Sequence, residues 1–223
     1  LHALMDLLYP RLCVVCRKCL TRGEHFLCTS CLYDFPFSDK HFSLEQELLD
    51  GFGENCRPDG LYSLFYYDKL SDYSNLVRAV KYRSRKDLGI YLGRMLGEKI
   101  RGKVEADAIV PVPLHPRREK QRGFNQSYQI ACGLAEVLQV EVWNEVVVRT
   151  ENNTSQTGLL PEERKKNVEN IFVLADAAKI AGKHLLIIDD VVTTGATVQA
   201  CVKTLAEAGN VLFTLACLAR TRS

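Results

Sequence analysis

The chain has 223 residues, of which 47% are hydrophobic and 25% are charged. This composition is ordinary for a soluble globular protein and allows one good-sized domain, or one domain and a small module. The net charge of +2 excludes a polycation. No apolar run is long enough to span a bilayer and no secretory signal is recognisable, so we expect a cytoplasmic protein without membrane insertion.

The N-terminal part, residues 1–60, is acidic and rich in cysteine. It holds 6 basic and 9 acidic residues, whereas residues 61–223 hold 23 and 18, so the second part is better suited to an anionic partner. The stretch 1–10 predicts a short amphipathic helix that ends at Pro10. We interpret residues 1–60 as a small module that consists of a helix, a metal-binding finger and a linker.

Five of the nine cysteines lie between residues 13 and 31. An odd total and C-x-x-C spacing argue against a secreted disulfide framework and for a metal site in a reducing compartment. Two such pairs, eleven residues apart, predict a tetrahedral zinc ion bound by four thiolates. The favoured ligands are Cys13, Cys16, Cys28 and Cys31.

Two alternatives to this ligand set stay open. Cys19 makes a second possible first pair with Cys16, and His25 can replace a thiolate. Four thiolates leave no open coordination position, so we expect a structural zinc ion that supplies the folding free energy of the module.

From residue 61 onward, strands and helices are predicted to alternate. The predicted strands cover 61–67, 107–114, 145–149, 171–174, 184–190 and 211–219. The predicted helices cover 71–82, 87–100, 124–138 and 197–208. This alternation predicts an α/β domain over 61–223, with a mostly parallel sheet and helices on both faces.

Two segments of this domain lack a clear pattern. A basic loop over 115–126 holds four cations within six residues, Arg117, Arg118, Lys120 and Arg122. It is either a solvated loop or a site for pyrophosphate or a nucleic-acid backbone, because guanidinium groups bind phosphate in a bidentate way. The eighteen residues 150–167 predict a lid or binding loop.

The stretch LLIIDDVVTTGAT, residues 185–197, carries the most chemistry. Asp189 and Asp190 follow a buried strand, at the edge where open parallel sheets bind ligands. The loop after them contains Gly195 and three threonines and leads into a helix, which makes an anion site. A sugar phosphate fits, because its hydroxyls donate to the carboxylates while its phosphate accepts from the loop. A helix cap explains one of these residues only, and a GK[ST] phosphate loop is absent.

This stretch resembles the 13-residue motif with which type I phosphoribosyltransferases bind phosphoribosyl pyrophosphate. The resemblance implies that Asp189 and Asp190 hold the ribose 2- and 3-hydroxyls. It also implies that the 5-phosphate is wrapped by Thr193, Thr194, Gly195, Ala196 and Thr197. Together with the cysteine pairs, three further stretches resemble the ComF family, in which a four-Cys zinc finger precedes a type I phosphoribosyltransferase-like domain. They are 79–96, 110–127 and 149–172.

The resemblance implies further site residues. The loop after the first core strand would receive pyrophosphate through Val112, Pro113 and Leu114, with Arg122 close by. Lys81 matches a recurrent family lysine, and the stretch 123–126 matches the family's RGFNQ. The flexible loop of the family would be 150–167, where the matching residues are Arg149, Thr150, Gln156 and Arg164; Arg164 joins the two aspartates as a catalytic candidate.

The resemblance implies displacement of pyrophosphate from ribose C1 by a nitrogen nucleophile, with Mg²⁺ on the pyrophosphate and an acceptor that the sequence does not identify. It also implies a role in natural competence, handling incoming single-stranded DNA alongside a helicase. The alternative hypothesis is a single-stranded DNA-binding protein that keeps the fold without turnover. The basic loop has few aromatic residues for stacking, Phe124 and Tyr128, which disfavours binding of single strands in general.

Overall fold

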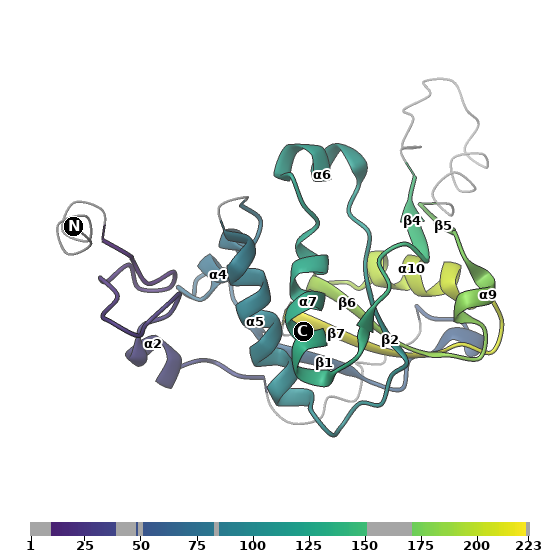
Figure 1. Cartoon of the computed structure of the whole chain (residues 1–223), viewed down its shortest axis with the longest axis horizontal. Coiled ribbons are helices and arrows are strands. Elements are labelled where there is room, and N and C mark those ends of the chain that lie inside the picture. Colours follow the sequence, from purple (N-terminus) through teal and green to yellow (C-terminus); the bar gives the residue numbers. More distant parts are fainter. Residues whose placement is uncertain (1–9, 39–47, 49–50, 83–84, 151–170, 222–223) are drawn as a thin grey trace.

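A parallel five-stranded sheet forms the centre of the molecule (Figure 1), and the computed structural model describes residues 10–38, 48, 51–82, 85–150 and 171–221. In spatial order its strands are β1 (Leu61–Tyr67), β7 (Leu212–Thr221), β6 (His184–Val192), β2 (Ala108–Pro111) and β3 (Glu141–Val142). The predicted α/β class with a parallel sheet is therefore confirmed.

Helices cover both faces of the sheet. α5 (Lys86–Ile100) and α7 (Gln126–Leu138) bury their apolar sides against one face. α9 (Ala177–Ile180) and α10 (Ala196–Ala206) lie on the other face, beside the antiparallel pair β4 (Val147–Arg149) and β5 (Phe172–Leu174). Because side chains alternate along β6, this strand contributes to both apolar cores. Leu186 and Ile188 belong to one core, and Leu185 and Ile187 belong to the other.

α5 and α7 pack unusually close together. A methyl group on Gly93 of α5 would overlap the backbone oxygen of Ile130, and one on Gly133 of α7 would overlap the backbone oxygen of Ile90. The two glycines thus let the helix backbones touch. This contact fixes the start of α7, which carries polar side chains to the edge of the sheet.

The strand order reverses between β2 and β6. From β2 the chain moves outward to β3, and it returns on the opposite side of β2 to form β6 and then β7. In open α/β sheets such a switch point leaves a crevice at the carboxyl ends of the two strands, where ligands bind.

The cysteine-rich part docks on the β1 edge of the sheet. Its buried side chains, including Val14 and Phe35, belong to the same apolar core as Phe65 of β1 and Leu92 of α5. Lys99 of α5 donates to the backbone oxygens of Ser38, Ser63 and Leu64, which ties this part to β1.

The region predicted as a basic loop is in part a helix, α6 (Pro116–Arg122), so that expectation was wrong. The His115 ring nitrogen accepts from the Arg117 amide, Pro116 supplies a first-turn residue without an N–H, and Gly123 ends the helix with a φ of 78°.

Other elements differ from the predictions in their bounds. α4 (Ser74–Ala79) is shorter than the predicted helix over 71–82, and β6 extends two residues beyond its predicted end at Asp190, to Val192. β3, α9, the helix α2 (Thr29–Tyr33) and the 3-10 turn η1 (Glu54–Cys56) had not been predicted. The predicted helix over 1–10 lies outside the described residues, except Pro10. Within the described ranges, no helix has the length and apolarity to cross a bilayer.

Candidate functional site

A cavity of about 150 Å³ opens at the carboxyl ends of β2 and β6, and we name it the switch-point cavity. Nine of its lining residues had been singled out as site residues from the sequence: Lys81, Val112, Pro113, Leu114, Arg122, Arg149, Asp189, Asp190 and Thr197. The other lining residues are Arg118, Asn125, Gln126, Ser127 and Val191. Residues from five separate segments therefore meet where the fold leaves a crevice.

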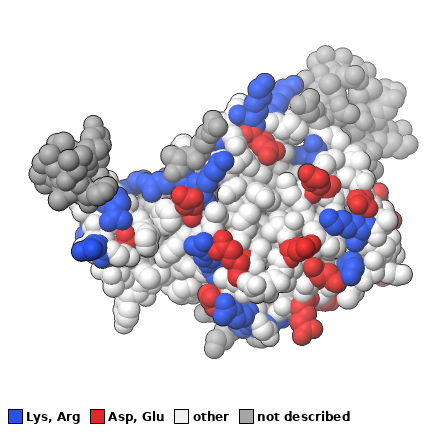
Figure 2. Space-filling view, in the orientation of Figure 1, with Lys and Arg blue, Asp and Glu red and all other residues white. Residues whose placement is uncertain are grey.

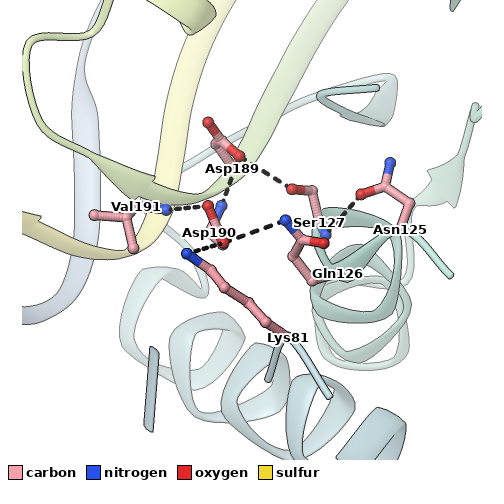
Figure 3. Close-up of polar contacts among 7 residues, drawn as sticks. All are labelled: Lys81, Asn125, Gln126, Ser127, Asp189, Asp190 and Val191. Carbon is pink, nitrogen blue, oxygen red and sulfur yellow. Dashed lines mark hydrogen bonds and ion pairs between the residues drawn. The ribbon is translucent and has the colours of Figure 1, made fainter. Parts of the chain in front are cut away.

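Asp190 is held by three contacts (Figure 3). Its Oδ2 lies 3.3 Å from the Lys81 ammonium and accepts from Gln126 Nε2, also at 3.3 Å. Its Oδ1 accepts from the Val191 amide at 2.8 Å. The side chain is 11% exposed, so these three contacts supply the partners that a carboxylate largely shielded from water requires.

Asp189 lies in a different environment. Its Oδ1 accepts from Ser127 Oγ at 3.1 Å and from the Asp190 amide at 2.8 Å (Figure 3). Burial, with the Asp190 carboxylate as a second cause, raises the pKa of Asp189 to about 7. The pair therefore holds one carboxylate with a cationic partner and one that gains a proton near neutral pH.

The start of α7 fixes the loop after β2. Asn125 caps the helix by accepting from the Ser127 amide at 3.0 Å, and its Nδ2 donates to the Val112 backbone oxygen at 3.1 Å. The Val112 amide in turn donates to Ile188 at 2.9 Å. One side chain thus ties helix, loop and central strand together beside the two aspartates.

Four basic side chains line the cavity: Lys81, Arg118, Arg122 and Arg149. Burial and the nearby Arg118 lower the pKa of Arg149, while Asp189 opposes this effect. Arg149 Nε and Gln126 Oε1 are buried and have no hydrogen-bond partner among the described residues. Because a buried polar atom without a partner is costly, the cavity is suited to a ligand that accepts from the arginine and donates to the glutamine.

Residues 193–195 connect β6 to α10, and the predicted phosphate loop continues with Ala196 and Thr197 in the first turn of that helix. Gly195 adopts a φ of 77° directly before the first residue of α10, and its Cα face is covered by the Leu48 side chain. Thr197 lines the switch-point cavity, whereas the other four residues of the loop do not. Gln156 and Arg164 lie outside the described residues, and their roles stay predictions.

Ser127 was missed as a site residue. It is the second residue after the RGFN stretch, where an N-capped helix begins. This capping signal could be recognised in the sequence. Its contact with Asp189 was not readable, because it depends on how α7 packs across the end of β6.

The second candidate site is the cysteine cluster. The sulfur atoms of Cys13, Cys16, Cys28 and Cys31 all lie within 4.8 Å of one another, and Cys16 Sγ and Cys28 Sγ are 3.6 Å apart. A tetrahedron with Zn–S bonds of 2.3 Å has edges of about 3.8 Å. The arrangement therefore suits a four-coordinate metal ion such as zinc, and it leaves the exposed Cys19 and His25 outside the group.

Electrostatics also favour a cation in this cluster. Burial opposes ionisation of Cys13, but backbone N–H groups of Cys16, Cys28 and Val15 outweigh it and lower the pKa of Cys13 to about 7. Burial and the neighbouring thiols raise the pKa of Cys31. Four thiolates share this small volume only when a metal ion neutralises them.

Known proteins resemble this chain in sequence over almost its whole length. Residues 122–223 match the family model described as a phosphoribosyl transferase domain. DNA utilization protein YhgH of Escherichia coli (strain K12) is 31% identical over 216 residues, which are 94% of this chain and 90% of that protein. Competence protein F of Haemophilus influenzae is 27% identical over 212 residues, which are 88% of this chain and 91% of that protein.

A solved structure, the glutamine phosphoribosylpyrophosphate amidotransferase from B. subtilis complexed with ADP and GMP, superimposes with a TM-score of 0.43 at 23% identity. The match covers 62% of this chain but only 30% of that enzyme. The identity to the E. coli relative over nearly its full length shows the family: the chain belongs to the ComF family, with a four-cysteine cluster ahead of a phosphoribosyl transferase domain.

Proposed function

We propose that the switch-point cavity binds phosphoribosyl pyrophosphate together with Mg²⁺. The observation that carries the proposal is the meeting of two carboxylates and four cations at one sheet edge. The carboxylates suit the hydroxyls of a ribose, and the cations suit a pyrophosphate. A free sugar without phosphates would leave the arginines unused.

Each residue has a role in this proposal. Asp190 and Asp189 accept from the ribose hydroxyls, and the loop from Thr193 to Thr197 takes the 5-phosphate on its backbone N–H groups. Val112, Pro113 and Leu114 receive the pyrophosphate, with Arg122 and Lys81 supplying positive charge. Bound Mg²⁺ would neutralise part of the pyrophosphate charge. A sugar hydroxyl or a cation-bound water would supply the donor that Gln126 Oε1 lacks.

The reaction that suits this site is transfer of the phosphoribosyl group to a nitrogen nucleophile. The bond from C1 to the pyrophosphate oxygen breaks and its electron pair leaves with the pyrophosphate. The nitrogen forms the new bond to C1, and its proton passes to the released pyrophosphate or to water. The chain's contribution is positioning and the stabilisation of charge on the leaving group by Arg122, Lys81 and Arg164.

The cellular role that we propose is the handling of DNA during natural competence, with single-stranded DNA and a helicase as candidate partners. It is supported by two relatives whose names refer to DNA utilization and competence. We place the protein in the cytoplasm, because an odd number of cysteines with C-x-x-C spacing favours a reducing compartment.

We further propose a structural zinc ion in the cysteine cluster and a division of the chain into a module over 1–60 and a domain over 61–223. A closed set of four thiolates leaves no position for a substrate, so the metal stabilises the module and takes no part in transfer.

Calorimetric titration tests the sugar-phosphate site. We expect Mg²⁺-dependent binding of phosphoribosyl pyrophosphate by the zinc-loaded chain. In Asp190→Asn we expect binding to weaken roughly ten- to hundredfold, since hydrogen bonds to a charged group contribute about 1.5–3 kcal/mol. Binding of ribose 5-phosphate should fall with it, whereas binding of inorganic pyrophosphate should not.

The matched control is Asp107→Asn, which makes the same chemical change at the opposite end of the sheet, where Asp107 accepts from the His184 amide. Its affinity should equal that of the wild type. No heat with any of the three ligands, in a folded wild-type protein, would refute the proposed function.

A further inference from the structure

The segment before β1 packs against α10 on one face of the sheet. Phe52 and Cys56 are buried in the same apolar core as Val198 and Val202 of that helix. Leu48 is partly buried and lies against this core. Because its side chains are buried there, the segment is fixed to the start of α10.

Leu48 lies directly on the phosphate loop, residues 193–197. A methyl group on Gly195 would overlap Leu48 Cδ1, so the leucine fills the space that a side chain at this position would occupy. Gly195 is buried beneath it, whereas its neighbours Thr194 and Ala196 are exposed. Gly195 is also the residue whose φ of 77° turns the chain into α10. The leucine therefore contacts the loop at the residue that sets its conformation.

Gln199 of α10 joins Leu48 to the phosphate loop. Its Nε2 donates to the Leu48 backbone oxygen at 3.0 Å, and its backbone N–H donates to the Gly195 oxygen at 2.8 Å. The Leu48 oxygen also accepts from the Gly51 amide at 3.3 Å. A methyl group on Gly51 would overlap the side-chain amide of Gln199, so the absence of a side chain there makes room for this bond. One glutamine thus links the segment before β1 to the turn of the loop.

The phosphate loop has no charged side chain of its own, since it consists of three threonines, a glycine and an alanine. Figure 2 shows Lys and Arg side chains gathered along the upper edge of this face, from the N-terminal module past α4 toward α6. There Arg78, Lys81 and Arg122 line one cavity. A neutral loop binds a phosphate only where its backbone N–H groups and hydroxyls converge on one point. Its affinity therefore depends on its conformation.

We propose that Leu48 and Gln199 are positioning residues that hold Gly195, and with it the phosphate loop, in the conformation that binds the 5-phosphate. The segment before β1 then completes the sugar-phosphate site. The inference rests on the proposed function of the switch-point cavity. Neither residue lines that cavity, so each acts through Gly195. A loop that is held in place before the ligand arrives loses less conformational entropy on binding.

Calorimetric titration of ribose 5-phosphate and of inorganic pyrophosphate tests the positioning role on the zinc-loaded full chain. Leu48→Ala removes the contact with Gly195. Gly51→Ala displaces only the flexible end of Gln199, so it breaks the hydrogen bond to Leu48 with little change in Tm. We expect either variant to bind ribose 5-phosphate about tenfold more weakly, a change of the order of fixing one backbone residue. Pyrophosphate binding should stay as in the wild type.

The matched control is Leu205→Ala, which makes the same truncation at a fully buried residue near the other end of α10. It should lower Tm more than Leu48→Ala does and bind ribose 5-phosphate like the wild type. Leu48→Met keeps an apolar side chain over Gly195 and should restore most of the affinity. If Leu205→Ala binds ribose 5-phosphate as weakly as Leu48→Ala, affinity follows stability and the positioning role is overturned.

Hydrogen exchange of the ligand-free protein separates this inference from the proposed function. We expect the amides of residues 194–198 to exchange roughly tenfold faster in Leu48→Ala and Gly51→Ala, because the loop opens locally more often. In Leu205→Ala their exchange should stay close to that of the wild type. Unchanged exchange in the first two variants, in a protein whose wild type binds ribose 5-phosphate, refutes the positioning role alone. A wild type that binds no ribose 5-phosphate refutes the proposed function and the positioning role together.

Discussion

The close approach of α5 and α7 makes Gly93→Ala destabilising. A methyl group there would lie 3.0 Å from the Ile130 carbonyl carbon and 3.1 Å from Gly133 Cα, and it would overlap the Ile130 oxygen. Carbon atoms normally approach to about 3.5–4.0 Å, so the two helices must separate by roughly half an ångström or more.

Two opposing terms set the size of the effect. Alanine gains about 1 kcal/mol over glycine in helix propensity, and overpacking of a rigid contact costs typically 1–3 kcal/mol, sometimes more. The obstacle is backbone, which cannot rotate away as a side chain can, so we place the cost at the upper end. The net loss is about 1–2 kcal/mol, which for a chain of this size lowers Tm by about 2–8 °C.

Gly89→Ala is the matched control in the same helix. Its methyl group would meet one atom, Gln129 Cβ, at 2.9 Å, while the nearest backbone atoms lie at 3.8 Å, so the strain is smaller than at Gly93 although the propensity gain is the same. Thermal unfolding of both variants, followed by circular dichroism on zinc-loaded protein, compares the two sites directly. A Gly93→Ala protein as stable as Gly89→Ala, or more so, would refute the close-approach argument.

Two other measurements follow from titration and metal binding. Burial raises the pKa of Asp189 from 3.8 to about 7, so the folded chain holds a proton that the unfolded chain loses, and stability falls as pH rises from about 4 to about 7. In Mg²⁺-free buffer, Asp189→Asn should therefore exceed the wild type in Tm by more at pH 8 than at pH 4; equal differences at both pH values contradict the shift. By elemental analysis, Cys19→Ser should retain one zinc ion per chain and Cys28→Ser should lose it, with a lower Tm because Val14 and Phe35 share the core of the sheet. Equal zinc contents would mean that a different ligand set binds the metal.

Much of the fold was readable from local patterns. The alternation of strands and helices predicted the parallel sheet, because each long element carries its own periodic signal, as α5 does with Leu88, Leu92 and Leu96. α6 was not predicted, because its seven residues bury no side chain and therefore carry no apolar periodicity; only Pro116 at its first turn and Gly123 after its end signal the helix. β3 has two residues, too few for any periodicity.

The residues of the candidate site could be predicted from the sequence, but the contacts between them could not. The sequence pointed to Asp189, Asp190 and Lys81, whose contact across 109 residues depends on strand order. Tyr82 shows the limit most clearly. Few aromatic residues are close to the basic loop in the sequence, and only the fold brings this ring, in the turn after α4, beside Gln121 and Arg122 at the end of α6.

The pairing of β1 with β7 has a consequence for biosynthesis. Leu61 faces Leu215 in the ladder, so the first strand of the sheet stays without this partner until the end of the domain has left the ribosome. During that interval the apolar face of β1 is exposed and open to misassociation. A metal-loaded cysteine cluster docked on β1 and α5 would shield part of that face from the start of synthesis. Zinc supply would then govern the yield of folded chain as much as its final stability.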